Sequence, residues 1–206
     1  VILEFIENEY DGISGTIDIP TLITEPIGSA EELAKVKDLL GSFKTSFKTS
    51  DADRSKNVRT GAGHIDGTVL YPGEVFSAYE YVNPFTEENG YAMAGSFLNG
   101  KTVDSLGGGI CQVSSTLYNA VLKAELEIVE RSPHSMMVSY VQASADAAIA
   151  GTWKDLKFKN SSDAPIYIEA YTTDGKQLVF NIYGQETRPS GRTVKYVNKV
   201  LESTPA

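Results

Sequence analysis

The chain has 206 residues, of which 41% are hydrophobic and 22% charged, so it is long enough for one domain with a real core and is not a disordered polypeptide. Its net charge of −9 argues against nucleic-acid binding, and no apolar run approaches the roughly 18–20 residues of a membrane span. One cysteine and two histidines exclude an internal disulfide and a zinc finger, so we expect no metal and no cofactor.

Acidic side chains are concentrated at the start of the chain, where residues 1–40 carry nine acidic and two basic residues. Such a charge step indicates two units of different origin. Ser29 opens a capping box with Glu32, leucines and a valine follow at helical spacing, and Gly41 occupies a C-cap position. We therefore interpret residues 1–42 as the end of one module plus a connector helix, and residues 43–206 as the main domain.

The main domain alternates strand and helix patterns in an order typical of an α+β fold. Helices are predicted at 51–61, capped by Asp51 or Ser50, and at 111–124. A Pro-Gly turn interrupts the extended stretch 69–76, and Asn99-Gly100 predicts a hairpin over 97–103. Strands are predicted at 42–50, 127–131, 136–142, 155–159, 165–172, 177–183 and 193–201. We expect a mainly antiparallel sheet packed with one or two helices.

The only thiol lies in the first turn of the second predicted helix, directly after three glycines. A helix N-terminus favours an anion, so we expect the pKa of Cys111 to lie below the roughly 8.5 of a free thiol. Residues without a Cβ let the backbone approach a substrate, and the N–H groups of Gly108, Gly109 and Cys111 form an expected oxyanion hole. Polar residues share the thiol's face of the helix: Ser114, Ser115 and Tyr118. A buried cysteine that only packs is the competing interpretation, and spacing alone leaves both open.

A thiol nucleophile needs a base, and the chain offers two imidazoles. His134 follows the cysteine helix by one predicted strand, a short path back to the same end, whereas His64 lies among glycines that suit a loop. His134 is therefore the favoured base. Asp146, a serine hydroxyl such as that of Ser135, or a backbone carbonyl would orient its ring, and the sequence leaves this choice open.

Other catalytic signatures are absent. The glycines form neither a phosphate-binding loop nor a dinucleotide fingerprint, and the serine pair lacks the nucleophile elbow. Glu87 and Glu88 are interpreted as a solvated turn, because paired glycosidase carboxylates cannot be recognised without geometry.

Residues 107–120, GGGICQVSSTLYNA, closely resemble the signature of the VanW domain, which is found in exported proteins of Gram-positive bacteria. Further matching motifs are NVR at 57–59, GTVLYPGEVF at 67–76, ENGY at 88–91, NGK at 99–101, PHS at 133–135 and VSY at 138–140. The resemblance covers roughly residues 43–185. Members often have His-Pro-His where this chain has Ser132-Pro-His134, so the first histidine is dispensable. Residues 1–42 resemble the end of the peptidoglycan-binding domain that often precedes this family.

The resemblance implies an L,D-transpeptidase-type cysteine acyltransferase that acts on peptidoglycan stem peptides outside the cell, at the wall or the outer membrane face. Cys111 is the implied nucleophile, and His134 is the histidine of the Pro-His-Ser element. Attack on the third stem residue would release D-Ala, and a neighbouring amine would complete a 3→3 cross-link. Expected substrate contacts come from Arg59, Gln112, Ser114, Ser115, Tyr118 and Tyr140, and Lys101 and Arg131 are further candidates for a substrate carboxylate. Membrane contact is expected only through segments outside this chain.

Two other functions stay open. A non-catalytic peptidoglycan-binding module would use Cys111 only for packing. An L,D-carboxypeptidase or endopeptidase would use the same thiol but hydrolyse stem peptides or existing cross-links.

Overall fold

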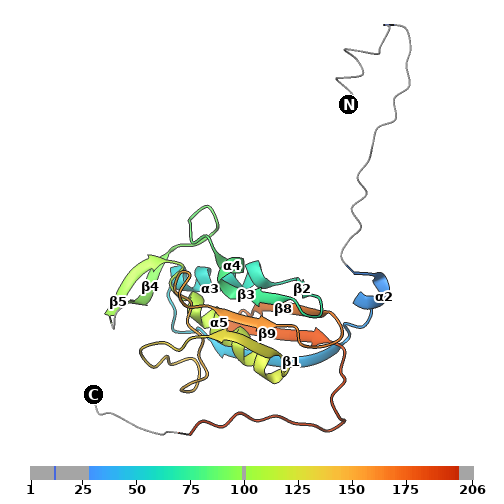
Figure 1. Ribbon diagram of the computed structural model, residues 1–206. Helices are drawn as coiled ribbons and strands as arrows, with labels where there is room; N and C mark the ends of the chain where they lie inside the picture. Colours follow the sequence, from blue (N-terminus) through green and yellow to red (C-terminus); the bar gives the residue numbers. More distant parts are fainter. Residues whose placement is uncertain (1–11, 13–27, 99–100, 200–206) are drawn as a thin grey trace.

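The computed structural model describes residue 12 and residues 28–98 and 101–199 (Figure 1). The helices are α2 (Ala30–Leu33), α3 (Ala52–Ile65), α4 (Ala78–Val82) and α5 (Ile110–Lys123). The strands are β1 (Asp38–Ser46), β2 (Thr68–Leu70), β3 (Val75–Ser77), β4 (Met93–Leu98), β5 (Lys101–Leu106), β6 (Glu127–Arg131), β7 (Leu156–Lys159), β8 (Ile166–Thr172) and β9 (Gln177–Gly184).

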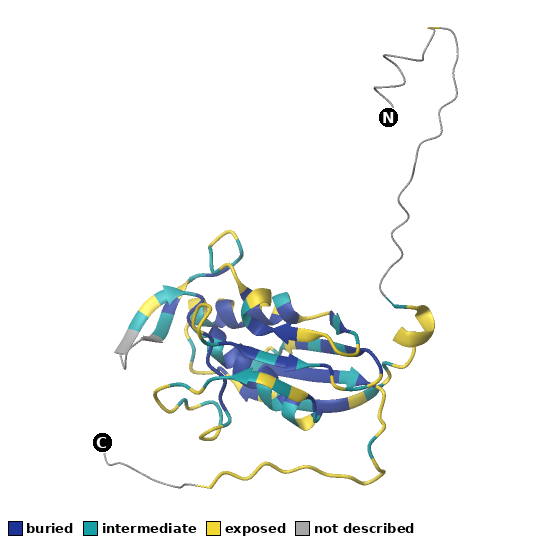
Figure 2. Cartoon of the chain, in the orientation of Figure 1, coloured by how far each residue is buried: buried dark blue, intermediate teal, exposed yellow. Residues whose placement is uncertain are grey.

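The largest sheet has the strand order β1-β9-β8-β2, and every pairing in it is antiparallel. Helix α5 packs on β1 and β9, helix α3 packs on β8, and the two helices contact each other. Alternating apolar residues of β8 and the apolar stripe of α5 fill the space between these layers, and Figure 2 shows the buried centre. The mixed helix and antiparallel-sheet architecture expected from the sequence is confirmed.

Two smaller sheets complete the fold, a three-stranded sheet β3-β7-β6 and the two-stranded pair β4-β5. The β4-β5 pair leads directly into the glycines before α5. This connection places the start of α5 at one end of the main sheet, beside the hairpin (Figure 1).

The connector helix is much shorter than predicted. The capping box is present, since the Ser29 Oγ accepts from the Glu32 N–H at 3.2 Å and the Glu32 carboxylate accepts from the Ser29 N–H at 2.9 Å. The helix nevertheless ends at Leu33, and the residues from Asp38 onward form β1. Gly41 is not a helix cap but lies at a register shift of β1, where a Cβ would come within 2.3 Å of a backbone oxygen of α5. Sheet pairing and close helix packing outweigh the local helical pattern.

Strand β1 therefore crosses the expected boundary at residue 42 and belongs to the sheet of the main domain. The segment 1–42, expected to be the end of a peptidoglycan-binding module plus a connector helix, is described only at residue 12 and from residue 28 onward, and its relation to such a module stays a prediction. The Asn99-Gly100 turn also lies outside them, although the pairing of β4 with β5 on either side of it is as expected for a hairpin.

Several predicted elements are confirmed, including the helix capped by Asp51, the helix that holds Cys111, and the strands that became β6, β7, β8 and β9. The strands predicted at 136–142 and in the described part of 193–201 are wrong, because both segments are loops without a sheet partner among the described residues. Alternation of apolar residues is not sufficient for a strand when no neighbouring edge is available.

Candidate active site

Cys111 is the second residue of α5, and the glycine run before it is shaped by close packing. Gly109 is the N-cap and has φ of 104°, a conformation that side-chain-bearing residues rarely adopt. A Cβ on Gly108 would lie 2.2 Å from the carbonyl oxygen of Ala94 in β4. The glycines therefore permit both the turn into the helix and its contact with β4.

The N–H groups at this helix start differ in whether they already have acceptors. The Gly108 N–H donates to the Ser105 carbonyl at 3.2 Å, so its expected place in an oxyanion hole is corrected. Among the described residues, the N–H groups of Gly109 and Cys111 donate to no acceptor. These two donors, adjacent to the sulfur, remain available for an oxyanion.

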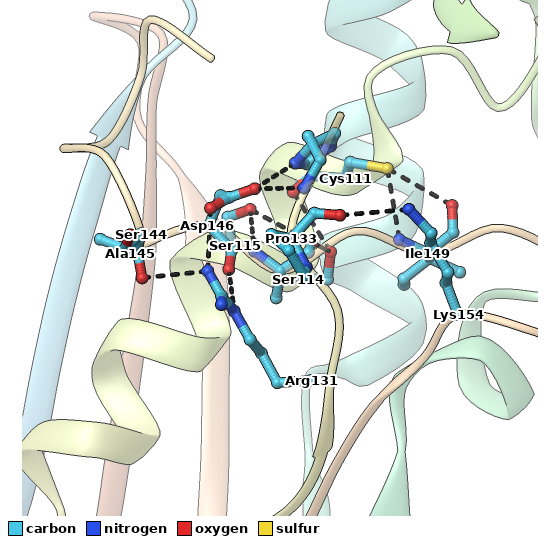
Figure 3. Close-up of polar contacts among 12 residues, drawn as sticks. Cys111, Ser114, Ser115, Arg131, Pro133, Ser144, Ala145, Asp146, Ile149 and Lys154 are labelled. Carbon is cyan, nitrogen blue, oxygen red and sulfur yellow. Dashed lines mark hydrogen bonds and ion pairs between the residues drawn. The ribbon is translucent and has the colours of Figure 1, made fainter. Parts of the chain in front are cut away.

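The polar face of α5 binds a loop. The Ser114 Oγ donates to the Ala147 carbonyl at 2.7 Å, and the Ser115 Oγ accepts from the Ala147 N–H at 2.9 Å. Further along the helix, the Asn119 amide donates to the Ala145 carbonyl at 2.7 Å. Ser114 and Ser115 are fully buried, so their expected contact with substrate is corrected: their hydroxyls hold the loop that carries Asp146 (Figure 3).

The sulfur of Cys111 lies against the same loop. The Ile149 N–H donates to Sγ at 3.5 Å, and the thiol in turn reaches the Ile149 carbonyl at 3.5 Å (Figure 3). Burial raises the pKa of the thiol, and the opposing effects of the Ile149 N–H and of the positive charges on Arg54 and Lys154 do not cancel it. The expectation of a lowered pKa is therefore wrong, because desolvation outweighs the Ile149 hydrogen bond and the two positive charges.

The imidazole of His134 is bound by Asp146. One carboxylate oxygen lies 2.6 Å from the His134 Nδ1 and accepts from the His134 backbone N–H at 2.7 Å. The other oxygen accepts from the Arg131 guanidinium at 2.9 Å. Burial raises the pKa of Asp146, but the hydrogen bonds from the His134 backbone and ring prevail, so the pKa lies below its ordinary value. Because Nδ1 faces this carboxylate, Nε2 is the nitrogen left to exchange a proton.

Cys111 and His134 both line a cavity of about 300 Å³. Its wall also includes Gly109, the guanidinium-bearing side chain of Arg54, Tyr140 and residues of the β4-β5 pair. Desolvation raises the pKa of Tyr140, so its hydroxyl is neutral in the cavity wall at physiological pH. The cavity thus brings together a thiol, an imidazole, a phenol and a cation.

Two other side chains predicted to contact the substrate, those of Gln112 and Tyr118, have structural partners instead. Gln112 borders the cavity, but its amide donates to the Thr45 hydroxyl and the Ser46 carbonyl, both at 3.0 Å, and it is buried. Tyr118 lies outside the cavity lining, with the Arg131 guanidinium 5.5 Å from the centre of its ring. These two side chains support the fold around the site.

The positive side chains expected to bind a substrate carboxylate are also elsewhere. Arg59 is exposed on α3 and lies over the ring of Phe47 at 5.9 Å, away from the cavity. Arg131 holds Asp146, and its Nε donates to the Asp146 carbonyl at 2.6 Å. The side chain of Lys101 lies outside the described residues. Arg54, which the sequence analysis missed, is an arginine that lines the cavity, and it lies next to Gly109 from a distant part of the chain.

The remaining candidates for the base and its partner are separated from the thiol. His64 packs edge-on against Tyr91, with ring centres 5.7 Å apart, and does not line the cavity. Ser135 is exposed, and in the described part of the chain its hydroxyl makes no hydrogen bond to the His134 ring.

The described residues contain neither a candidate metal site nor a candidate membrane-spanning helix. Among them, no group of three or more His, Cys, Asp or Glu side chains has a metal-binding arrangement, and no helix has the length and hydropathy to cross a membrane.

A cysteine at a helix N-terminus and a histidine held by an aspartate thus line one cavity of an α+β domain. A family model described as "VanW like protein" matches residues 53–183, and the chain belongs to this family. It is 37% identical over 164 residues to the uncharacterized protein YoaR of Bacillus subtilis, covering 79% of this chain and 54% of that protein.

The chain is also 28% identical over 136 residues to the vancomycin B-type resistance protein VanW of Enterococcus faecalis, covering 63% of this chain and 49% of that protein. It therefore spans about half the length of the curated relatives it matches. No solved structure gives a significant match.

Proposed function

We propose that this domain is a cysteine acyltransferase of the L,D-transpeptidase type that acts on peptidoglycan stem peptides. The observation that carries the proposal is the shared cavity of Cys111 and His134, with the His134 Nδ1 bound 2.6 Å from Asp146. This is the arrangement of a nucleophile, a base and a group that orients the base. Vancomycin resistance in the name of the Enterococcus relative supports a wall substrate. Peptidoglycan lies outside the cell, so we infer that the domain acts there.

The reaction begins with transfer of the thiol proton to the His134 Nε2 as Sγ attacks the carbonyl carbon of the third stem residue. The resulting oxyanion accepts hydrogen bonds from the N–H groups of Gly109 and Cys111. The C–N bond then breaks, and D-Ala leaves with the proton from the imidazolium. A thioester on Cys111 remains.

A side-chain amine of a second stem resolves the thioester. It attacks the same carbon, gives its proton to His134, and the C–S bond breaks as the new amide forms. The sulfur takes the proton back from the imidazolium. Water in place of the amine makes the enzyme a carboxypeptidase.

Because the pKa of the Cys111 thiol is raised, the base has to remove the thiol proton during the reaction. Because the resting sulfur is protonated, nucleophilic attack requires proton transfer to His134 at the same time or just before. Asp146 keeps the proton of the neutral ring on Nδ1 and stabilises the imidazolium once it forms.

A test supplies disaccharide-tetrapeptide to the wild type and to Cys111→Ala, His134→Gln and, as a matched control, Ser135→Ala. Mass spectrometry follows cross-linked dimer, free D-Ala and the acyl-enzyme. The proposal expects turnover in the wild type and in the control, an acyl-enzyme only when Cys111 is present, and a loss of about 10²–10⁴-fold in His134→Gln. Unchanged turnover in Cys111→Ala overturns it.

The competing function is a peptidoglycan-binding module without chemistry. The observation in its favour is the raised pKa of the thiol, which keeps the sulfur protonated at neutral pH. It predicts equal binding of the tetrapeptide by wild type and Cys111→Ala, with no product and no acyl-enzyme in either. Cleavage of supplied cross-linked dimers, without formation of new ones, would instead identify an endopeptidase.

A further inference from the structure

Arg54 lies directly over the N-terminus of the cysteine helix. A Cβ added to Gly109 would be 2.9 Å from the Arg54 Cγ, 3.4 Å from Nε and 3.5 Å from Cζ. The absence of a side chain at the N-cap therefore makes room for the guanidinium. Arg54 and Cys111 line the same cavity, so this cation borders the space above the thiol.

The charge of Arg54 has no carboxylate partner among the ion pairs of the described residues. Its guanidinium donates to the hydroxyl of Ser50. The nearest acid, Asp51, uses its carboxylate to accept from the Arg54 backbone N–H at 2.7 Å as the cap of α3. Within the described part of the chain, this half-buried cation binds only a neutral hydroxyl, which leaves most of its donors for a ligand.

Other groups around the cavity also make its electrostatic potential more positive. The N-terminus of α5 carries a partial positive charge, and the N–H groups of Gly109 and Cys111 have no acceptor among the described residues. Lys154 also lies close enough to act on the thiol electrostatically, and its ammonium donates to the Pro133 carbonyl at 3.2 Å (Figure 3). A cation, a helix N-terminus and two unpaired donors beside one cavity are a site for an anion.

The anion must be part of a molecule whose carbonyl carbon reaches Sγ. In a peptide, a carboxylate at the chain end is one residue, about 3.8 Å between Cα atoms, beyond the bond that is broken. An internal peptide bond has a neutral amide at that place. The planar guanidinium distinguishes these two groups, because it pairs with a carboxylate through two parallel hydrogen bonds.

We propose that Arg54 binds the terminal carboxylate of the acyl donor and so restricts the site to the last peptide bond of a stem. This inference rests on the proposed function, since it assumes that the donor peptide occupies the Cys111 cavity. It implies that the domain breaks the last peptide bond of a stem, as a transpeptidase or carboxypeptidase does, and it disfavours an endopeptidase.

The test first measures binding without chemistry. In a Cys111→Ala background, calorimetry compares a stem tetrapeptide with a free C-terminal carboxylate and the same peptide as its C-terminal amide. The acid is expected to bind about 10- to 100-fold more tightly than the amide. In Cys111→Ala with Arg54→Gln, this preference is expected to fall to near one, by loss of affinity for the acid alone.

Two further variants separate recognition from general effects. Lys56→Gln, an exposed residue on the same helix, removes the same charge and is expected to keep the full preference. Arg54→Lys keeps the positive charge but loses the planar guanidinium, so part of the preference for the acid over the amide should remain. This variant replaces Arg54→Gln in the test if Arg54→Gln does not fold.

The outcomes are distinguishable. Equal affinity for acid and amide in the Cys111→Ala background, or an equal loss of both in Arg54→Gln, overturns the role of Arg54. An Arg54-dependent preference for the acid in a protein whose wild type shows no turnover overturns the proposed reaction and leaves the carboxylate site in place. Turnover of acid and amide at the same kcat/KM by the wild type contradicts the inference and leaves the acyltransferase.

Discussion

Asp146→Asn tests whether the loop carboxylate organises the site. The wild-type carboxylate takes three donors: the His134 N–H at 2.7 Å, the His134 Nδ1 at 2.6 Å and the Arg131 Nη2 at 2.9 Å. The Asn amide keeps one acceptor oxygen and turns an NH₂ group toward a donor. It also leaves the Arg131 charge without its partner.

The magnitude follows from these contacts. A hydrogen bond to a charged group contributes about 1.5–3 kcal/mol, and the variant loses at least one and opposes another, so the free energy of unfolding should fall by about 3 kcal/mol at pH 7. With a urea slope near 2 kcal/mol/M, the unfolding midpoint moves down by about 1.5 M.

The effect has a defined pH dependence. The folded pKa of Asp146 lies below its ordinary value of 3.8, because the hydrogen bonds from His134 outweigh burial. The contribution of the carboxylate to stability is therefore complete above about 3.8 and is lost as the pH falls through the folded pKa. The difference between wild type and Asp146→Asn should therefore shrink below pH 4.

Urea unfolding followed by circular dichroism measures this difference across the pH range. Asp163→Asn, an exposed acid in the β7–β8 connection, is the matched control and should unfold like the wild type. An unchanged midpoint for Asp146→Asn at pH 7, or a difference that does not shrink in acid, would contradict this role of the Asp146 carboxylate.

Four further predictions concern the start of α5, helix α3 and the loop that carries Asp146. Gly108→Ala should destabilise the protein by about 2 kcal/mol or more, because its Cβ would lie 2.2 Å from a backbone oxygen of β4. Gly63 occupies an exposed position of α3 where a Cβ meets nothing within 4 Å, so Gly63→Ala should stabilise the protein by about 0.5–1 kcal/mol, and urea unfolding checks both variants. The alkylation rate of Cys111 with iodoacetamide should titrate above the roughly 8.5 of free cysteine, since burial raises its pKa, and a midpoint below 7 would contradict this. Ser115→Ala should cost about 1–3 kcal/mol and speed hydrogen exchange at the Ala147 amide, which loses its acceptor at 2.9 Å.

The sequence alone predicted contacts correctly where the two contacting residues lie within a few positions of each other. The carboxylate of Asp51 caps α3 by accepting from the Arg54 N–H at 2.7 Å, three residues on, and the Ser29 capping box forms although its helix is short. The glycine run followed by a helix with an apolar stripe placed Cys111 in the first turn of α5. Such contacts depend on the backbone between neighbouring residues, so a single sequence contains them.

Contacts between distant segments could not be predicted in the same way. Leu39 and Leu40 have helical spacing, yet β9 supplies a sheet edge almost 140 residues later that makes them part of a strand. The segment 136–142 alternates like a strand but finds no such edge. Strand formation depends on a partner whose position is set by the whole fold.

The candidate thiol, its position in the first turn of a helix and the preference for His134 over His64 could all be predicted from the residues alone. The folded chain was needed to show that Asp146 faces the ring, that Ser114 and Ser115 bind a loop, that burial raises the pKa of the thiol, and that Arg54 lies next to Gly109. The physical reason is that desolvation and charge pairing depend on the groups packed around an atom, and most of those groups come from remote parts of the chain.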